Sequence, residues 1–331
     1  MVALAETSDI NRQGMGDLLA DFFDGLQQLA NGVVIELAPN LVHEFHGFLA
    51  SLLGDTLGIH NILGFKEGVG FALRSCRNCF GDHGQIQVFF EENQFQLRHL
   101  ALHRAICAFL NGLQGAAKEH YSTFVGINNA SIMDNVPGFN LIDMAPQDMM
   151  HVLIEGGLAH EMRLFIRYCV REAEYFTLAE LNERIDSFAY GPQEKSNRPS
   201  PIKEAHIDGD TTGLPRQKAA QIWLLARVLG FLIADLVPHD DQHAQCFSWH
   251  LRILFAAFSP EVHPVTEPYL RIWISAHHQL FRICYPDVAI TPKLHYCIHI
   301  PSTQRRYLGR KKKKKKKRKR NEIRVKKERV R

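Results

Sequence analysis

Cysteine and long apolar runs are scarce in this chain, and each scarcity excludes a class of protein. Only 7 of the 331 residues are cysteine. That is too few for a disulfide framework and fits a reducing compartment, where thiols are free or bind metal. No apolar run reaches the roughly 18 residues of a membrane span, so we expect no membrane partner. The N-terminal stretch has no basic start followed by an apolar segment, so we expect no secretory signal.

The remaining composition is that of a globular protein. The sequence contains no internal repeat, and it is 46% hydrophobic and 22% charged. Its length suits one large domain or two of ordinary size.

The net charge of +4 hides two segments of opposite charge. Residues 310–331 contain 16 of the 39 Lys and Arg side chains and 2 of the 35 acidic ones, a net charge of +14, which leaves −10 for residues 1–309. DNA phosphates repel an acidic body unless its positive charges are clustered. We expect the tail to be disordered and to serve as a nuclear address or a nonspecific nucleic-acid arm. The alternative is an artefact of a low-complexity lysine-coding stretch.

The spacing of apolar residues predicts an α+β chain that is mostly helical. Two apolar runs, residues 32–37 and 41–49, flank a Pro-Asn turn and predict a β-hairpin. We expect the second run to continue as a strand that carries Asp55 at its tip. Residues 191–213 are polar and rich in Gly and Pro, which predicts a linker or mobile loop. Helices are predicted over residues 15–30, 95–118, 146–174, 177–188, 214–236, 242–258 and 265–284.

Two cysteines three residues apart, Cys76 and Cys79, form a motif that binds a tetrahedral metal ion or works as a redox pair. His99 and His103 lie four residues apart on a predicted helix, which places both imidazoles on one face. Cys107 continues that face. These residues are the candidate zinc ligands, and the alternative is a pair of stray thiols beside a polar helix face. A thioredoxin-like site is disfavoured because the two cysteines lie in a Gly-rich loop.

Two carboxylates have the placement of a two-metal phosphoryl-transfer site. Asp55 is expected at a strand tip, and Glu155 shares one face of a predicted helix with Asp148 and His151. Two Mg²⁺ ions about 3.5–4 Å apart would activate water and stabilise the leaving oxygen. The alternative is a solvated helix face whose first acid is favoured by the helix dipole.

The C-terminal part is rich in histidine. His277 and His278 are adjacent, and His295 and His299 lie four residues apart, all of them among aromatic residues. We interpret them as core or structural histidines, with a second metal site as the alternative.

Short fragments in a fixed order carry a resemblance to a known family. Over residues 15–309 the chain resembles the transposon-derived DDE transposases of the CACTA/Transib group. The fragments are Gly47-Phe48-Leu49 with Gly54-Asp55-Thr56, Gly64-Phe65-Lys66, Cys76-Arg77-Asn78-Cys79, Phe95-Gln96-Leu97-Arg98, Gly126-Ile127-Asn128, Asp148-Met149-Met150-His151 with Glu155-Gly156, and Pro292-Lys293-x-His295 with His299-x-Pro301.

This resemblance implies a fold and a site. The fold would be a partial RNase H-like core, made of the hairpin and flanking helices, with a large helical insertion and a C-terminal helical region. The implied parts are residues 1–175, the core with the zinc site inserted; residues 176–309, the C-terminal helical region; and the disordered tail, residues 310–331.

The resemblance also implies the roles of the candidate residues. Asp55 and Glu155 would be the second and third of three acids that hold Mg²⁺ or Mn²⁺. Cys76, Cys79 and His103 would bind a structural zinc ion. The family often has a second histidine where this chain has Ile106, so the fourth ligand would be His99 or Cys107.

The first acid of the family belongs upstream of a segment like residues 15–49. We therefore expect an N-terminally truncated fragment, catalytically inactive, whose ancestral activity was metal-dependent DNA cleavage and strand transfer. One alternative is a domesticated protein-interaction scaffold in which zinc is structural. The other is a nucleic-acid binder that uses the basic tail, which also implies a nuclear location.

Overall fold

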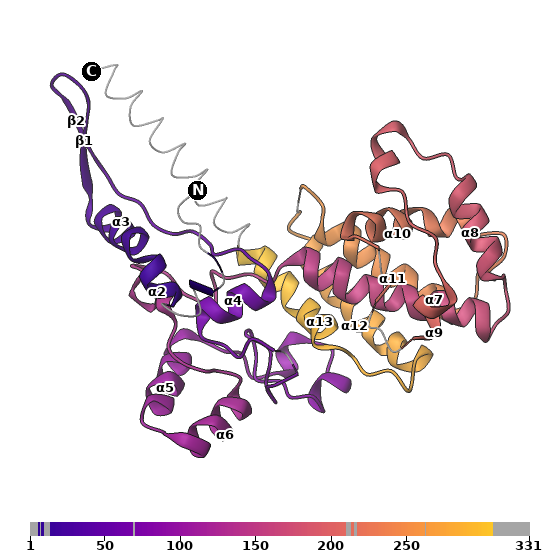
Figure 1. Ribbon diagram of the computed structural model, residues 1–331, viewed down its shortest axis with the longest axis horizontal. Helices are drawn as coiled ribbons and strands as arrows, with labels where there is room; N and C mark the ends of the chain where they lie inside the picture. The colour runs from indigo at the N-terminus through magenta and orange to yellow at the C-terminus, as the bar shows by residue number, and fades with distance from the viewer. Residues whose placement is uncertain are drawn as a thin grey trace. The chain divides into compact units, whose positions relative to one another are not determined.

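The chain folds into two compact units, shown in Figure 1. The structure is a computed structural model that describes residues 6, 8–9, 14–68, 70–209, 213–214, 217–261 and 263–306. The tail at 310–331 lies outside these ranges, so its predicted disorder stays a prediction.

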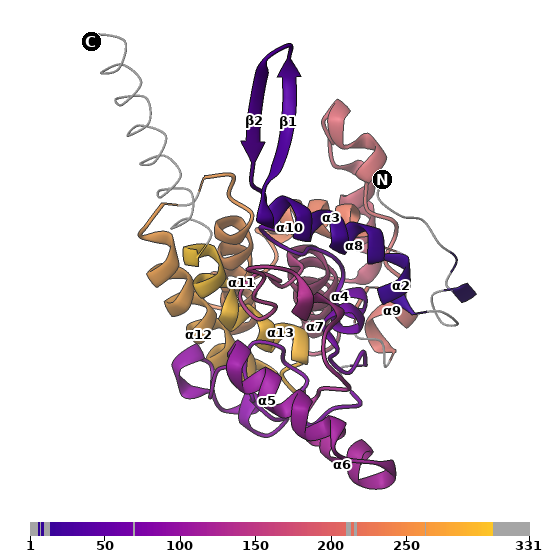
Figure 2. The same ribbon diagram turned by 90° about the vertical axis from the view of Figure 1, so that its left-hand side faces the viewer.

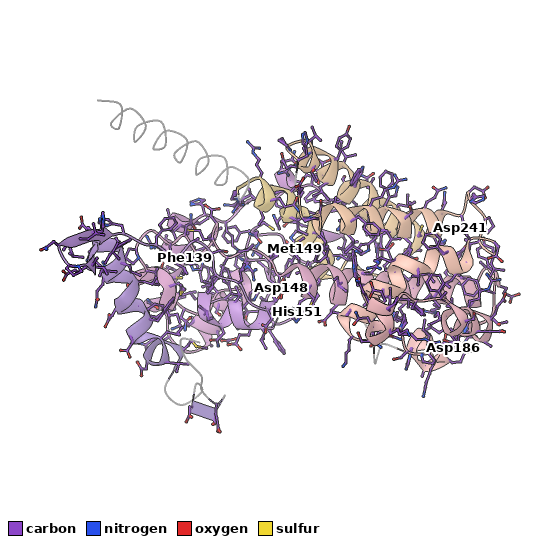
Figure 3. The ribbon with its side chains drawn as sticks, turned by 90° about the horizontal axis from the view of Figure 1, so that it is seen from above. Phe139, Asp148, Met149, His151, Asp186 and Asp241 are labelled. Atoms are coloured by element: carbon purple, nitrogen blue, oxygen red, sulfur yellow. The ribbon has the colours of Figure 1, made fainter. Side chains whose placement is uncertain are left out.

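The two units do not follow the predicted parts. Unit 1 comprises residues 1–85 and 95–148, and unit 2 comprises residues 86–94 and 149–331. Asp148 and Met149, at which the chain passes from unit 1 into unit 2, are labelled in Figure 3. The boundary expected at residue 175 falls instead inside unit 2, between two of its helices.

Unit 1 begins with two helices and a hairpin. Helices α2 (Met15–Leu18) and α3 (Ala20–Asn31) cover the amphipathic stretch predicted at 15–30 and are separated at Leu19. Strands β1 (Val33–Ala38) and β2 (Leu41–Phe45) pair antiparallel, which confirms the predicted hairpin. Figure 2 shows the hairpin extending away from α3, and most of its side chains are exposed.

The expectation that a strand carries Asp55 at its tip is wrong. Strand β2 ends at Phe45, and residues 46–55 have no regular secondary structure. Asp55 instead caps α4 (Thr56–Leu63), where its Oδ1 accepts a hydrogen bond from the backbone N–H of Gly58 at 2.7 Å. Aspartate suits this position because its oxygen satisfies a free N–H group and its charge opposes the helix dipole.

The fold class is α+β and mostly helical, as predicted. In the described residues the hairpin is the one sheet, so the partial RNase H-like core stays a prediction. The helix predicted at 95–118 is two helices, α5 (Leu100–Asn111) and α6 (Gly115–Val125). The turn between them needs Gly115, whose φ of +54° is rarely adopted by residues with a side chain. The apolar core of unit 1 includes Ile59, Leu63, Phe65, Leu110, Ile127, Met133 and Leu141.

Unit 2 is a helical assembly. A π-helix, Met150–Leu158, continues directly into α7, which confirms a helix within the predicted range 146–174. Helix α7 packs on α11, α11 packs on α12, and the π-helix contacts α7, α10 and α13 (Figure 1). The helices of this unit are α7 (Ala159–Arg171), α8 (Leu178–Ser187), α9 (Glu204–Asp208), α10 (Ala219–Ile233), α11 (Gln242–Ala257), α12 (Thr266–Cys284) and α13 (Pro292–Tyr296).

The polar segment 191–213 contains more structure than the predicted loop. It forms a 3₁₀ helix, Pro192–Asn197, and helix α9. The side-chain amide of Asn182 on α8 fixes it: Nδ2 donates to the carbonyl of Ile202, and Oδ1 accepts from the N–H of Ile202, both at 2.8 Å. Further 3₁₀ turns lie at Gln85–Gln87, Glu92–Gln94, Ile132–Asn135 and Cys297–His299.

Membrane crossing has no support among the described helices. The longest of them, α12, has 19 residues and includes charged side chains. No helix in the described ranges combines the length and the apolar character that a membrane span requires.

Candidate metal sites

Cys76 and Cys79 lie in a buried loop of unit 1, each no more than 1% exposed. The backbone N–H of Asn78 donates to Cys76 Sγ, and the N–H of Gly81 donates to Cys79 Sγ, both at 3.4 Å. Each sulfur therefore accepts from the N–H group two residues further along the chain. Hydrogen bonds of this kind stabilise negative charge on sulfur, which is the form that binds metal.

Arg98 holds this loop in place. Its Nε donates to the carbonyl oxygens of Cys76 (2.8 Å) and Cys79 (3.0 Å). One of its terminal nitrogens donates to the carbonyls of Arg74 (3.0 Å) and Val125 (2.7 Å). The guanidinium group thus ties the cysteine loop to the end of α6 and fixes the positions of both sulfurs.

The two thiols are close enough to affect each other's ionisation. Contact with Cys76 raises the pKa of Cys79 far above its usual value, and burial raises it further. Neither cysteine is in a disulfide bond. Because two adjacent thiolates repel each other, ionisation of both requires a cation between them. A zinc ion bound by both sulfurs would supply that charge.

Two of the other predicted zinc ligands have partners of their own. His99 caps α5, where its Nδ1 accepts from the N–H of Leu102 at 3.2 Å. The Cys107 thiol donates to the carbonyl of Asn129 at 3.5 Å. In the described part of the chain, neither His99 nor Cys107 belongs to a close group of metal-ligand side chains that includes Cys76. Their role as zinc ligands therefore stays a prediction.

His103 is buried against an aromatic ring. Its imidazole centroid lies 5.1 Å from that of Phe65. Burial, and secondarily the charge of Arg98, lowers the pKa of His103 to about 4. The neutral imidazole is the form that binds metal, but within the described ranges His103 forms no close ligand group with the two cysteines.

The two predicted acids lie in different units. Asp55, in unit 1, is exposed and caps α4. Glu155, in unit 2, lies on the π-helix with its Oε2 3.6 Å from His151 Nε2, and His151 is labelled in Figure 3. Among the described residues of its own unit, neither acid belongs to a close group of three metal-ligand side chains.

His295 and His299 form a buried pair in unit 2, with ring centroids 5.4 Å apart. Nδ1 of His299 lies 3.0 Å from Oε1 of Glu92. Although burial raises the pKa of Glu92, hydrogen bonds from His299 and Ser302 lower it overall, so this carboxylate is ionised. A carboxylate that accepts from Nδ1–H is the usual partner of a metal-bound histidine, and it serves a structural histidine equally well.

Sequence reasoning missed most of a third group, inside the helical core of unit 2. Glu161 on α7, His250 on α11 and His277 on α12 are each no more than 1% exposed. Glu161 Oε2 lies 2.7 Å from His277 Nε2 and also contacts His250 Nδ1. One ligand atom from each residue lies within 4.8 Å of the others. The one signal in the sequence was the adjacent pair His277-His278, and helical spacing does not link that pair to Glu161 or His250.

The charge state of this group follows from its contacts. Burial raises the pKa of Glu161, but His277 and His250 outweigh it and the pKa is low overall. Burial lowers the pKa of His250, although Glu161 opposes the shift. The centre therefore holds an ionised, fully buried carboxylate in contact with two imidazoles.

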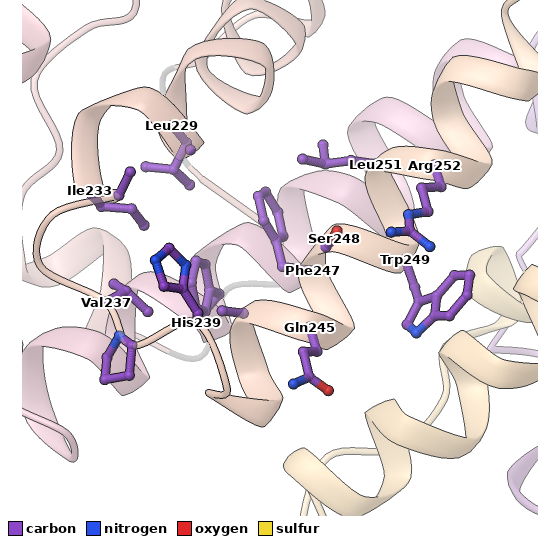
Figure 4. Close-up of a pocket in the computed structure, with 15 residues that line it drawn as sticks. Leu229, Ile233, Val237, His239, Gln245, Phe247, Ser248, Trp249, Leu251 and Arg252 are labelled. Carbon is purple, nitrogen blue, oxygen red and sulfur yellow. The ribbon is translucent and has the colours of Figure 1, made fainter.

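A pocket of about 480 Å³ opens in unit 2 beside α10 and α11. Figure 4 shows apolar side chains on its walls, among them Leu229, Ile233 and Phe247. The guanidinium carbon of Arg252 lies 4.6 Å from the ring centroid of Trp249 at this pocket. Its single imidazole, His239, lies at one side, so the pocket has no metal-ligand group among its lining residues.

Comparison with known proteins adds no family. No protein-family model matches the chain, and a comparison with curated proteins gives no match. The candidate sites are therefore argued from their own geometry.

Proposed function

We propose that this chain is a transposase-derived protein that acts as a zinc-stabilised binding scaffold and not as a nuclease. The observation that carries the proposal is the Cys76–Cys79 loop. Its two N–H to Sγ hydrogen bonds and the Arg98 clamp arrange both thiols, in a buried site, to act together as thiolate ligands. A structural zinc site of this type contributes directly to the free energy of folding.

The two predicted acids support a role other than cleavage. Two-metal catalysis requires several carboxylates that converge on one pair of ions. Asp55 uses its carboxylate to cap α4, and Glu155 faces an imidazole rather than a second acid. Both acids thus make local structural contacts. This supports a scaffold that retains the sequence motifs of a DDE transposase but does not cleave DNA.

Metal analysis of the purified full chain tests the zinc site. We expect Cys76→Ser and Cys79→Ser each to remove one equivalent of zinc relative to the parent chain. Cys284→Ser, a half-buried thiol in unit 2, is the matched control and should leave the zinc content unchanged. In the cobalt-substituted protein the thiolate-to-metal absorption band should disappear with Cys76.

The ligands that complete the site are found by the same measurement. Substitution of His99, His103 and Cys107, one at a time, identifies which of them hold zinc. Zinc content that does not change in either Cys76→Ser or Cys79→Ser would show that the loop binds no metal, and the scaffold proposal would fail.

Cleavage assays test the second half of the proposal. With Mg²⁺ or Mn²⁺ we expect no DNA cleavage and no strand transfer. Asp55→Asn is the informative variant, because asparagine also caps helices well but binds divalent cations poorly. Nuclease activity that is present in the parent chain and lost in Asp55→Asn would make the protein an enzyme.

A further inference from the structure

A chain of hydrogen bonds in unit 2 fixes the ring protons of two buried histidines. His278 Nε2 lies 2.9 Å from the carbonyl oxygen of Leu294, which can only accept. His278 Nδ1 lies 3.0 Å from Nδ1 of His277. A neutral imidazole carries one ring proton. The proton of His278 is therefore given to Leu294, and the proton of His277 fills the bond between the two rings.

No ring proton is left for the nitrogen that faces Glu161. His277 Nε2 lies 2.7 Å from Glu161 Oε2, so a neutral pair would direct a nitrogen lone pair at a carboxylate oxygen. Such a contact is repulsive unless a cation lies between the two atoms. The cation is either an additional proton or a metal ion.

Two further contacts favour the metal ion. His250 Nδ1 meets the same carboxylate oxygen, Oε2, that faces His277. The other oxygen, Oε1, is fully buried and receives no N–H or O–H hydrogen bond in the described structure. Two imidazoles thus contact one oxygen of Glu161, while the other has at most the weak thiol donor of Cys246 nearby, which is costly in a protein interior. A divalent cation can coordinate both imidazoles and either oxygen.

We propose that Glu161, His250 and His277 form a buried binding site for a divalent transition metal, for which zinc is the natural probe. One carboxylate and two imidazoles are a ligand set that zinc and iron(II) both accept. His278 positions the ligand, because His277 donates its Nδ1–H to it, as metal-bound histidines donate their second N–H.

Cys246 lies one turn before His250 on α11, fully buried, with its thiol beside Glu161. It does not belong to the group of three residues whose ligand atoms lie within 4.8 Å of one another. Because those three ligands come from α7, α11 and α12, a bound metal ion would join the three helices as a structural element.

The site is independent of the cysteine loop, since all of its residues belong to unit 2. The proposed zinc site at Cys76 and Cys79 and the proposed site in unit 2 are therefore tested by separate experiments. The double variant Cys76→Ser/Cys79→Ser, as the full chain, should still bind one equivalent of zinc, and its thermal unfolding midpoint should rise when zinc is added. If it binds none, the unit 2 site does not exist, whatever the result at the cysteine loop.

Single substitutions then locate the metal. Glu161→Gln and His250→Gln should each lower zinc affinity at this site by at least about 100-fold, and His278→Ala by about 10- to 100-fold. His243→Gln is the matched control on α11, because His243 instead bonds to the carbonyl of Cys284 at 3.0 Å. Folding of each variant is checked by circular dichroism.

X-ray absorption of the zinc-loaded Cys76→Ser/Cys79→Ser variant identifies the ligand atoms directly. At the zinc edge it should show nitrogen and oxygen neighbours. Sulfur neighbours alone, or unchanged zinc affinity in folded Glu161→Gln and His250→Gln, would show that a proton bridges Glu161 and His277.

Discussion

Single buried imidazoles determine how unit 1 responds to acid. Both ring nitrogens of His103 are buried without a hydrogen-bond partner in the described structure, and burial lowers the pKa of His103 to about 4. His60 behaves alike, with its pKa lowered to about 4 chiefly by burial. The unfolded chain protonates these rings near pH 6.5, so between pH 6.5 and 4 it binds more protons than the folded chain. The free energy of unfolding is therefore not reduced by these two rings above pH 6.5, and it falls as the pH drops toward 4.

We predict that His103→Leu flattens this acid dependence. The substitution removes a ring that contributes at most about 3 kcal/mol of pH-dependent stability, and at neutral pH it removes two unsatisfied nitrogens, for a gain of about 1–2 kcal/mol. Urea unfolding midpoints between pH 4 and 8 measure both effects, with the exposed His120→Gln as control. Loss of bound zinc at pH 7 in His103→Leu would instead support the sequence-based assignment of His103 as a ligand.

At the scale of single residues, the sequence predicts correctly those features that depend on residue spacing alone. The pairing of Cys76 with Cys79 follows from three residues of separation, so it could be predicted. The role of Asp55 depends on where β2 ends and α4 begins, and the apolar run from 41 to 53 has no signal for that end. Glu161 looked like an ordinary helix residue, because only tertiary packing shows that its face is buried.

At the scale of elements, helical periodicity predicted where the helices lie but not every form they take. Helices α8, α10, α11 and α12 begin and end within about five residues of their predicted limits. The π-helix was missed, since a stretch read at 3.6 residues per turn does not reveal i to i+5 hydrogen bonding. The prediction that His151 and Glu155 share one helix face assumed α-helical spacing. In a π-helix that spacing does not apply, so the geometry of the pair comes from the structure.

The π-helix places Gly157 directly against the proposed metal site. A Cβ atom at this position would lie 3.0 Å from Cε1 and 3.2 Å from Nε2 of His250. We predict that Gly157→Ala displaces the His250 ring, lowers stability by about 1–3 kcal/mol through overpacking, and weakens zinc binding at Glu161. Chemical denaturation and zinc titration measure the two effects.

Gly230→Ala is the matched control for this substitution. Gly230 lies on α10, and a Cβ atom there meets nothing within 4 Å. Alanine should therefore stabilise the helix by about 0.5–1 kcal/mol. Equal stability of the two alanine variants would mean that His250 has room to move, and the proposed coupling between the π-helix and the site would be wrong.

At the scale of the whole molecule, the sequence could not predict what joins distant segments. Glu161 is 89 residues from His250 and 116 residues from His277 along the chain. No periodicity links such positions, because the contact arises from the packing of three helices that periodicity describes only one by one. Arg98 presents the same difficulty in unit 1, where its partners Arg74 and Val125 come from either side of it in the sequence.

The opposite charges of the tail and the rest of the chain lead to a prediction about DNA binding. Eleven consecutive basic residues, Arg310–Arg320, fall in a tail of net charge +14 that follows 309 residues of net charge −10. We predict that the full chain binds duplex DNA without sequence preference. If about ten phosphates are contacted, the slope of log K against log salt concentration is about −9. The acidic body competes for the tail at low salt, so affinity there should be lower than that of the isolated tail peptide.

Deletion of residues 310–331 provides the comparison. The shortened chain should lose DNA binding, because its remaining charge repels phosphate, while its zinc content should not change. A fluorescent fusion of the full chain should accumulate in the nucleus and the fusion without the tail should not. DNA affinity that survives the deletion would reveal a basic cluster on the acidic body. Equal distribution of the two fusions between nucleus and cytoplasm would remove the nuclear role of the tail and favour its origin as a coding artefact.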